Sequence, residues 1–519
     1  MAHNRMPEVH DFDNKPLRNM VAVGAVGPHS VRLWMRSERP GVLTIRWWPD
    51  GEEHAACQGG LCIPAANECD NTCSVLLPDD LPPAPPLTAL RRYRFHIAHQ
   101  ADNVCIGEGR FETAPKDPED TPARFALALM SCHQPFADNG VLTEPSGQML
   151  RAVYRCLQAH NTKLVFTVGD QMYADSPPAL SLFNDAYFST VAPAGRTCLQ
   201  ECTAAEVRRM YQRRYRHFWN VPAWQAIHAD FPCYPILDDH EIVDNWGTKP
   251  AHHTPAWRAI GEGARAAYSD YQGSRVFSSL QMLPEAFNYT VSYGHLGVFV
   301  MDLRSTRSAW NGGELFSEAQ GAALRHFLHE HRDKQCLCIV LSVPLVHLPR
   351  LPVKAVGYLA HWHEDFADRW STGAHRRDRD HLLQWLYAHQ CQHPRQRIIL
   401  LSGDIHIGCV HEIRWLPRGP SLYQMISSGV TNDIGALMHN ISTFLIRLNR
   451  QVTTDDGTLQ ARVRLLRGVR GRRQNPYGGL NVGIVEIETP TPGASPKLRF
   501  LLYRHEGDEP VCVYRSPQV

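Results

Sequence analysis

The feature that most constrains this chain is an alternation of short apolar runs with amphipathic stretches, which begins after residue 123. This alternation is typical of strands that helices bury on both faces, so it predicts an α/β fold. Six of the apolar runs are followed directly by segments with polar side chains. Residues 131–133 follow RFALALM, 170–173 follow KLVFTVG, 238–241 follow YPIL, 302–304 follow GVFVM, Ser342 follows CLCIVL, and 404–406 follow RIILLSG. Because the C-terminal ends of neighbouring strands face one crevice in an open α/β sheet, we expect these groups to converge.

Helical stretches separate the predicted strands. Their signals are an apolar helical face after Ser146 and two capping boxes further along the chain. The face consists of Leu150, Val153, Tyr154 and Leu157, and the boxes pair Thr203 with Glu206 and Ser317 with Gln320. The segments LNVGIVEIE and KLRFLLYRHE near the C-terminus return to a strand pattern, so we expect them to complete a sheet.

The chain is predicted to contain two domains. A length of 519 residues exceeds what one core usually supports. Residues 20–50 and 93–115 are short alternating runs broken by Gly and Pro, which predicts an all-β module over residues 1–118. Residues 51–87 are rich in Cys and Pro and are predicted to be an irregular insertion in that module. Residues 114–122 have the composition of a linker, and residues 119–519 are assigned to the α/β domain.

Composition excludes several classes of protein. Lys and Arg total 53 against 52 Asp and Glu, a net charge of +1, so no overall field favours nucleic acid or an anionic membrane. No apolar run reaches the roughly 18 residues of a membrane span, and the first residues lack the apolar core of a signal peptide, so we predict a cytoplasmic protein. The 15 Cys have scattered spacings that match no zinc finger. We expect mostly buried thiols, because disulfides would need an oxidising compartment.

A basic stretch precedes the C-terminal strands. Residues 462–473 hold six Arg, namely Arg462, Arg464, Arg467, Arg470, Arg472 and Arg473. The ordinary interpretation is a solvated helix or loop face, and a contact with a substrate or polyanion is the alternative. Specific nucleic-acid binding is not expected, because no aromatic residues are interleaved with the Arg. The sequence does not specify an oligomeric state.

The residues at the strand ends are of types that hold metal ions. Taken singly, an Asp after Val-Gly can cap a helix and a Cys at a strand end is usually packing. Together, Asp, His, Asn and Cys at one structural position indicate a metal centre. Asp170 can bridge two ions, which suits hydrolysis of a phosphoric ester, and Gly169 and Gly403 would keep the backbone close to the metals. Cys132 as a thiolate and Tyr173 as a phenolate suit a trivalent or late transition metal.

Several motifs carry a resemblance to a known family. GRFETAP is followed by SCHQPF, GDQMYAD, DDHEIVDNW, MDLRSTR and GDIH. This order and spacing resembles the PhoD-like alkaline phosphatases, a branch of the calcineurin-like metallophosphoesterases. The resemblance implies a four-layer sandwich of two central sheets flanked by helices, with an N-terminal immunoglobulin-like β-sandwich. It also implies a site that contains iron, as Fe(III), and calcium, as Ca(II).

The resemblance implies a role for each motif residue. The iron ligands would be Cys132, Asp170, Tyr173 and His406, and the calcium ligands would be Asp170, Asn245 and Asp404. Asp239 stands where a metal-binding Asn is usual, His240 is the candidate general acid, and Arg304 is expected to hold phosphate oxygens. Mg, Mn or Zn can replace calcium at the second site.

The sequence departs from the family pattern in three places. It lacks the twin-arginine export signal common in the family, it has Asp244 where Asn is frequent, and it carries a long segment near residues 431–476 that we interpret as an insertion. These departures leave the compartment and the substrate open.

The combined patterns predict hydrolysis of phosphoric esters by metal-activated hydroxide. Small phosphomonoesters and phosphodiesters are both candidate substrates. Iron-dependent oxygen chemistry is a second hypothesis, because His and carboxylate ligands also form facial triads, although a triad needs only three protein ligands. A catalytically inactive relative that acts as a binding scaffold is a third hypothesis, and the intact ligand list argues against it.

Overall fold

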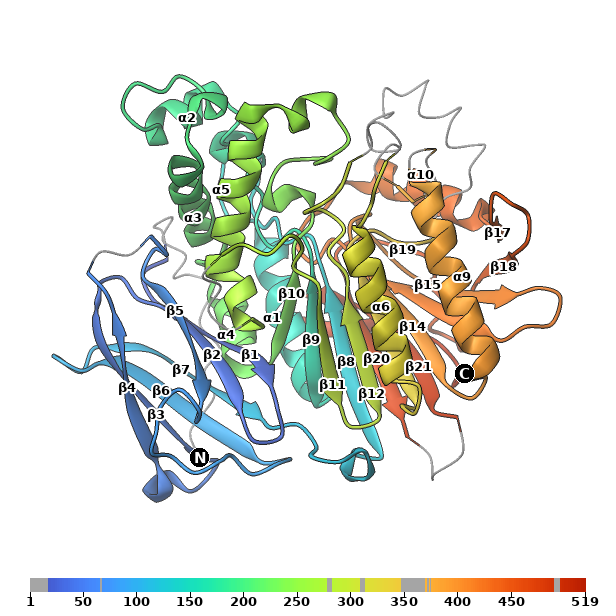
Figure 1. The fold of residues 1–519 in the computed structure, drawn as a ribbon, viewed down its shortest axis with the longest axis horizontal. Coiled ribbons are helices and arrows are strands. Elements are labelled where there is room, and N and C mark those ends of the chain that lie inside the picture. Colours follow the sequence, from blue (N-terminus) through green and yellow to red (C-terminus); the bar gives the residue numbers. More distant parts are fainter. Residues whose placement is uncertain are drawn as a thin grey trace.

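Four β-sheets and the helices around them make up the fold (Figure 1). The computed structural model describes residues 17–65, 68–277, 282–308, 313–346, 369–370, 373, 375–489 and 495–519. Two small sheets come from the N-terminal part of the chain, and two large sheets come from the rest. The predicted mixed α/β fold is therefore confirmed.

The two small sheets share one apolar core, to which Leu33, Trp47 and Phe95 contribute buried side chains. One sheet has the order β1 (Met20–Val26), β2 (Val31–Arg36), β5 (Thr72–Leu77), and the other β4 (Cys57–Ile63), β3 (Gly41–Pro49), β6 (Arg92–His99), β7 (Cys105–Glu112). The prediction of an irregular insertion over residues 51–87 is wrong, because β4 and β5 lie there and pair with β3 and β2. Gly59 and Gly60 weaken the strand pattern of β4, which only its pairing with β3 reveals.

The first large sheet has six strands. Its order is β10 (Cys233–Ile236), β9 (Thr162–Val168), β8 (Arg124–Met130), β20 (Val482–Glu488), β21 (Lys497–Glu506), β22 (Glu509–Arg515). Strands β8, β9 and β10 run parallel, and β20 to β22 add antiparallel strands beside them. The expectation that the C-terminal segments complete a sheet is confirmed.

The second large sheet has nine strands. Its order is β11 (Tyr289–Tyr293), β12 (Leu296–Val300), β13 (Cys336–Leu341), β14 (Arg397–Ser402), β16 (Ser421–Ile426), β15 (Ile407–Trp415), β18 (Gln460–Leu465), β17 (Gln451–Thr453), with β19 (Tyr477–Gly478) paired to β15. The segment 431–476, which we interpret as an insertion, supplies β17 and β18 to this sheet. Arg462 and Arg464 lie on β18 rather than on a helix or loop, and they alternate with the buried Ala461 and Val463 at the period of a strand.

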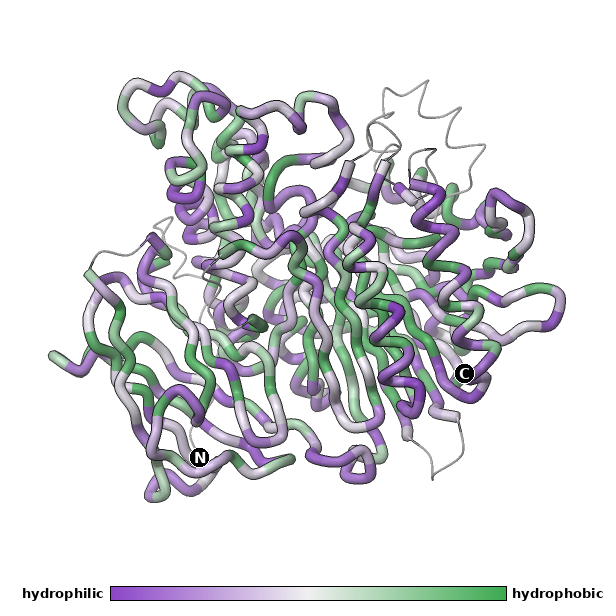
Figure 2. The backbone as a smooth tube through the Cα atoms, in the orientation of Figure 1, coloured by the Kyte–Doolittle hydropathy of each residue, from purple (hydrophilic) through white to green (hydrophobic). Residues whose placement is uncertain are grey.

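Side chains of β13 point alternately into two cores. Cys338 lies in the core that includes the six-stranded sheet, whereas Ile339 lies in the core under α6 (Glu318–Glu330) and α9 (Arg376–Gln392). These two helices cover one face of the nine-stranded sheet (Figure 1), and Figure 2 shows the apolar residues gathered along the central strands. The run CLCIVL is continuously apolar because both of its faces are buried.

Among the residues that the structure describes, the other α-helices are α1 (Glu144–Ala159), α2 (Asp185–Val191), α3 (Ala204–Phe218), α4 (Pro222–Asp230), α5 (Pro255–Tyr271) and α10 (Ala436–Leu448). The Thr203 capping box is confirmed, and Ser317 Oγ accepts from the backbone N–H of Gln320. Helix α1 begins before Ser146, because Thr143 caps it and Pro145 is tolerated in the first turn. In the described part of the chain, no helix has the length and apolarity needed to cross a bilayer.

Candidate metal centre

Five polar residues occupy equivalent positions, each two residues after the last residue of a strand. Cys132 follows β8, Asp170 follows β9 and Asp238 follows β10, while Asp302 and Asp404 follow β12 and β14. The first three strands run parallel in one large sheet, and β12 to β14 run parallel in the other. A contact of 3.8 Å between Cys132 Sγ and the carbonyl oxygen of Asp404 joins the two sets. The expected convergence is therefore confirmed for these ends.

Asp170 is central to the resulting cluster. Its Oδ2 lies 3.2 Å from Cys132 Sγ and accepts from the Tyr173 hydroxyl at 3.3 Å. Two groups have ligand atoms within 4.8 Å of one another: Asp170 with Asp239 and His240, and Asp238 with Asp239 and Asp404. Asp239 belongs to both groups and connects them, so most of the predicted site residues lie together.

The other two predicted ligands join the cluster through neighbours. The backbone N–H of His406 donates to Ser428 Oγ at 2.8 Å, and this oxygen is 3.1 Å from Cys132 Sγ. The backbone N–H of Asn245 donates to Asp239 Oδ2 at 2.7 Å. All seven predicted ligands are thus linked by contacts, and Ser428 is a neighbour that the sequence did not single out.

Most of these ligands have a left-handed backbone, which non-glycine residues seldom adopt. The φ angles are 60° at Cys132, 57° at Asp170, 56° at Asn245, 69° at Asp404 and 53° at His406. Such a conformation costs roughly 1–3 kcal/mol per residue and persists where the surroundings fix it, often at functional sites. The strand ends are therefore bent so that their side chains meet.

A buried carboxylate holds two of these strand ends. Glu241 accepts from the backbone N–H groups of Asp170 at 2.8 Å, Gln171 at 2.6 Å and Asp238 at 2.8 Å, and from the Gln272 side chain at 3.0 Å. Burial raises the pKa of Glu241 to about 7, against these hydrogen bonds. The sequence reasoning missed this role, although the Asp-x-x-Glu spacing of a capping box was present.

Gly169 and Gly403 permit close packing between neighbouring strand ends. A Cβ on Gly169 would lie 2.3 Å from the Cβ of Asp238, and a Cβ on Gly403 would lie 2.4 Å from Ser131 Oγ. Both distances are shorter than real Cβ contacts allow. The sequence predicted close approach at these positions, and the structure shows protein atoms as the neighbours.

Crowding of acidic groups shifts their pKa values. Burial, followed by the neighbouring Cys132, raises the pKa of Asp170 well above its usual value, and burial also raises the pKa of Asp238 in spite of Arg304. Burial would raise the pKa of Asp239 too, but Arg304 and then His240 outweigh it and lower this pKa to about 2. A nearby cation would stabilise the charged form of every carboxylate here.

His240 lies between carboxylates that fix its ring and its charge. Its Nδ1 is 2.8 Å from Asp175 Oδ1, and its Nε2 is 3.9 Å from the half-exposed Asp244. Burial lowers the pKa of His240, but Asp175, Asp239 and Asp170 together raise it well above the usual value. Asp175 is a further residue that the sequence reasoning did not assign, although it closes the GDQMYAD motif.

Arg304 is buried against two carboxylates of the cluster. Its side chain is 0% exposed, its Nε donates to Asp238 Oδ1, and its terminal nitrogen lies 3.6 Å from Asp239 Oδ1. Asp302 accepts the backbone N–H of Arg304 at 2.9 Å. Arg304 therefore holds two carboxylates of the cluster in place.

The residues present fit metal ions. Within the described residues, His406 Nδ1 and Asp238 Oδ2 are buried atoms without a hydrogen-bond partner. Burial lowers the pKa of His406 to about 4, so its imidazole is neutral at neutral pH, which is the form that binds metals. A thiol, a phenol, an imidazole and several carboxylates together make a ligand set for a hard and a softer cation.

Known proteins show the same sequence pattern and fold. Residues 127–432 match the sequence profile described as PhoD-like phosphatase. Alkaline phosphatase D of Bacillus subtilis (strain 168) is 26% identical over 220 residues, which cover 41% of this chain and 33% of that protein, so the alignment spans about a third of the relative. The solved structure of PhoD covers 95% of this chain and 91% of its own, with a TM-score of 0.64 and 15% identity, which shows a shared fold. The family match covers more than half of this chain and includes the strand ends of the cluster. This chain therefore belongs to the PhoD-like phosphatase family.

Proposed function

We propose that the protein hydrolyses small phosphoric esters, as a phosphomonoesterase, a phosphodiesterase or both, at a centre that holds metal ions. The observation that carries the proposal is the convergence of Cys132, Asp170 and Asp404 from three strand ends in two sheets. The likeness to alkaline phosphatase D supports the same class of reaction.

The ligand residues fall into two proposed sets. Fe(III) would be held by Cys132, Asp170, Tyr173 and His406, and Ca(II), or Mg, Mn or Zn, by Asp170, Asp239, Asn245 and Asp404. When bound, the cations supply the Lewis acidity that activates water for attack and offsets phosphoryl charge. Cys132 and Tyr173, whose pKa values are raised first of all by burial, would ionise only beside a cation, which favours a trivalent ion at the first set.

His240 is the proposed general acid for the departing ester oxygen. Asp175 holds its Nδ1, so the transferable proton is at Nε2. The raised pKa keeps the ring protonated at neutral pH, and cations bound nearby would bring this pKa down toward the working range. Arg304 is proposed to hold phosphate oxygens and to position the cluster through Asp238 and Asp239.

The family relation also supports a finer description of the fold. We propose that the two large sheets with their helices form the four-layer sandwich of a domain at 119–519. The two small sheets would form an immunoglobulin-like β-sandwich at 1–118. The alternating burial along β13 and the core between the small sheets support this division.

Asp170→Ala tests the proposed function most directly. We expect kcat/KM for an aryl phosphate to fall by at least about 10³-fold, equivalent to about 4 kcal/mol of transition-state stabilisation, together with loss of bound metal by elemental analysis. Asp185→Asn, an exposed Asp at the start of α2, is the matched control and should behave like the parent. Full activity or full metal content in Asp170→Ala would contradict the proposal, and parallel assays with a monoester and a diester would identify the substrate class.

A further inference from the structure

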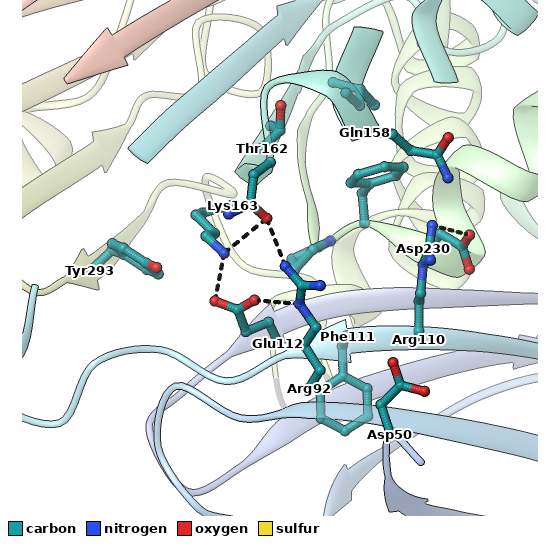
Figure 3. Close-up of a pocket in the computed structure, with 14 residues that line it drawn as sticks. Asp50, Arg92, Arg110, Phe111, Glu112, Gln158, Thr162, Lys163, Asp230 and Tyr293 are labelled. Atoms are coloured by element: carbon teal, nitrogen blue, oxygen red, sulfur yellow. Dashed lines mark hydrogen bonds and ion pairs between the residues drawn. The ribbon is translucent and has the colours of Figure 1, made fainter. Parts of the chain in front are cut away.

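A pocket of about 190 Å³ lies between the four-stranded and the six-stranded sheets (Figure 3). Strands β6 and β7 supply Arg92, Arg110, Phe111 and Glu112, and the opposite wall comes from α1, β9, α4 and β11. Strand β9 runs from this pocket to Asp170, a path of eight residues or roughly 25 Å at the rise of a strand. The pocket is therefore separate from the metal centre.

The charges that line the pocket balance one another. Lys163 Nζ lies 2.5 Å from Glu112 Oε1, Arg92 Nε lies 3.0 Å from Glu112 Oε2, and a terminal nitrogen of Arg110 lies 3.2 Å from Asp230. The lining has three basic residues, Arg92, Arg110 and Lys163, and three acidic ones, Asp50, Glu112 and Asp230. A phosphate or another strong anion would need cations in excess, so this lining favours an uncharged ligand.

Two hydroxyl groups in the lining lack a partner. Within the described residues, the Tyr293 hydroxyl and Thr162 Oγ1 are buried atoms without a hydrogen bond. Figure 3 shows the Tyr293 hydroxyl on the side of its ring that faces Lys163 and Glu112. Burial and then Glu112 raise the pKa of Tyr293 above its usual value, so the group keeps its proton. Each hydroxyl can both donate to and accept from a ligand.

The rest of the lining combines planar polar groups with apolar surface. Gln158 and Asn161 offer amides, while Phe111, Phe231 and Pro232 offer apolar faces. Hydroxyl groups on a compact carbon frame suit such a lining, because the amides and hydroxyls can bond the ligand's oxygens while the apolar faces cover its C–H groups. The volume is below the roughly 300 Å³ at which pockets for drug-sized ligands begin.

We propose that this pocket binds an uncharged polyhydroxylated molecule no larger than a monosaccharide, such as a sugar or a cyclic polyol. Thr162 and Tyr293 make hydrogen bonds to its hydroxyl groups, and the Lys163–Glu112 pair contributes a third polar contact. The site is independent of the proposed hydrolysis.

Calorimetric titration of the full chain tests the proposal. Glucose and myo-inositol serve as neutral probes, and inorganic phosphate and sulfate as anions. The anions are also titrated into Asp170→Ala, so that heat from binding at the metal centre can be identified. We expect binding of at least one neutral probe at millimolar concentration or below, and no heat from the anions beyond that of the metal centre. Tyr293→Phe and Thr162→Val should each weaken that binding by about three- to tenfold.

Thermal unfolding separates a lost ligand contact from a damaged fold. Removal of a buried hydroxyl without a partner should leave the Tm of the ligand-free protein unchanged or raise it, while the ligand-induced shift in Tm decreases. Tyr187→Phe removes another buried hydroxyl outside the pocket and should retain binding. The proposal is overturned by absence of binding to both neutral probes, by unchanged binding in both pocket variants, or by a preference for the anions. None of these outcomes bears on hydrolysis, because the readout is binding.

Discussion

Charged side chains are unbalanced at one end of β9 and paired at the other. At the C-terminal end, Asp170 lies among other acidic groups, and burial raises its pKa well above the usual value. At the N-terminal end, Lys163 and Arg92 both contact Glu112 within 3.0 Å. The acidic groups around Asp170 need added cations to balance their charge, whereas the charges around Glu112 are balanced by neighbouring side chains. Local balance of charge, rather than the number of charged residues, distinguishes the metal centre from the pocket.

After Asp170→Ala, the largest effect is expected from His240→Gln, also at the metal centre. Loss of the general acid should lower kcat by about 10²- to 10⁴-fold while bound metal is retained. The loss should be smaller for 4-nitrophenyl phosphate than for phenyl phosphate, because a better leaving group needs less protonation. Equal losses for both esters, measured in steady-state assays, would contradict the acid role and leave His240 as a structural residue.

Stability of the metal-free protein should fall as the pH rises. The pKa of Glu241 is about 7 in the folded protein and 4.5 as an ordinary Glu, so the native state binds more protons between these values. Its stabilising effect is complete below pH 4.5 and is lost as the pH rises through 7, at up to about 1.4 kcal/mol per pH unit. Asp170 and Asp238 act in the same direction.

Urea unfolding of chelator-treated protein at pH 5 and pH 7 measures this dependence. Protein reloaded with metal should be less sensitive to pH, because the cations stabilise the ionised carboxylates. A metal-free protein that is more stable at pH 7 than at pH 5 would show that the charges at the C-terminal end of β9 balance without metal. The two ends of the strand would then not differ in this respect.

Glu112→Gln tests the charge balance beside the N-terminal end of β9. It leaves Lys163, which is 8% exposed, beside a neutral amide, so the free energy of unfolding should fall by about 1–3 kcal/mol. Bound metal should match that of the parent, because Glu112 lies at the opposite end of β9. A loss of metal in this variant would show that the two ends are coupled along the strand.

The smallest effect is expected from Arg470→Ala, in the exposed basic stretch away from both ends. The free energy of unfolding should change by less than about 0.5 kcal/mol, as for most surface substitutions. Steady-state kinetics should match the parent within about twofold. A larger loss of kcat/KM would favour the alternative in which residues 462–473 contact the substrate.

The sequence predicted the strand ends because a polar residue after a long apolar run is a local signal. Cys132, Asp170, Tyr173 and Asp404 were found in this way, and the family motifs added Asn245. The partners of these residues could not be found locally, since they depend on contacts between distant segments. The burial of Arg304 against Asp238, 66 residues away, is one example. The pairing of β4 and β5 into the small sheets is another, because their own residues carry a weak strand pattern.

Glu241 couples the local opening of the two segments that follow β9 and β10. A single carboxylate is shared by the backbones that follow β9 and β10, and Gln272 links it to the end of α5. Local opening at either strand end breaks the same set of hydrogen bonds, so the two ends open as one cooperative unit. We therefore expect a substitution that displaces one of these loops to be tolerated only if the other loop still reaches the same carboxylate.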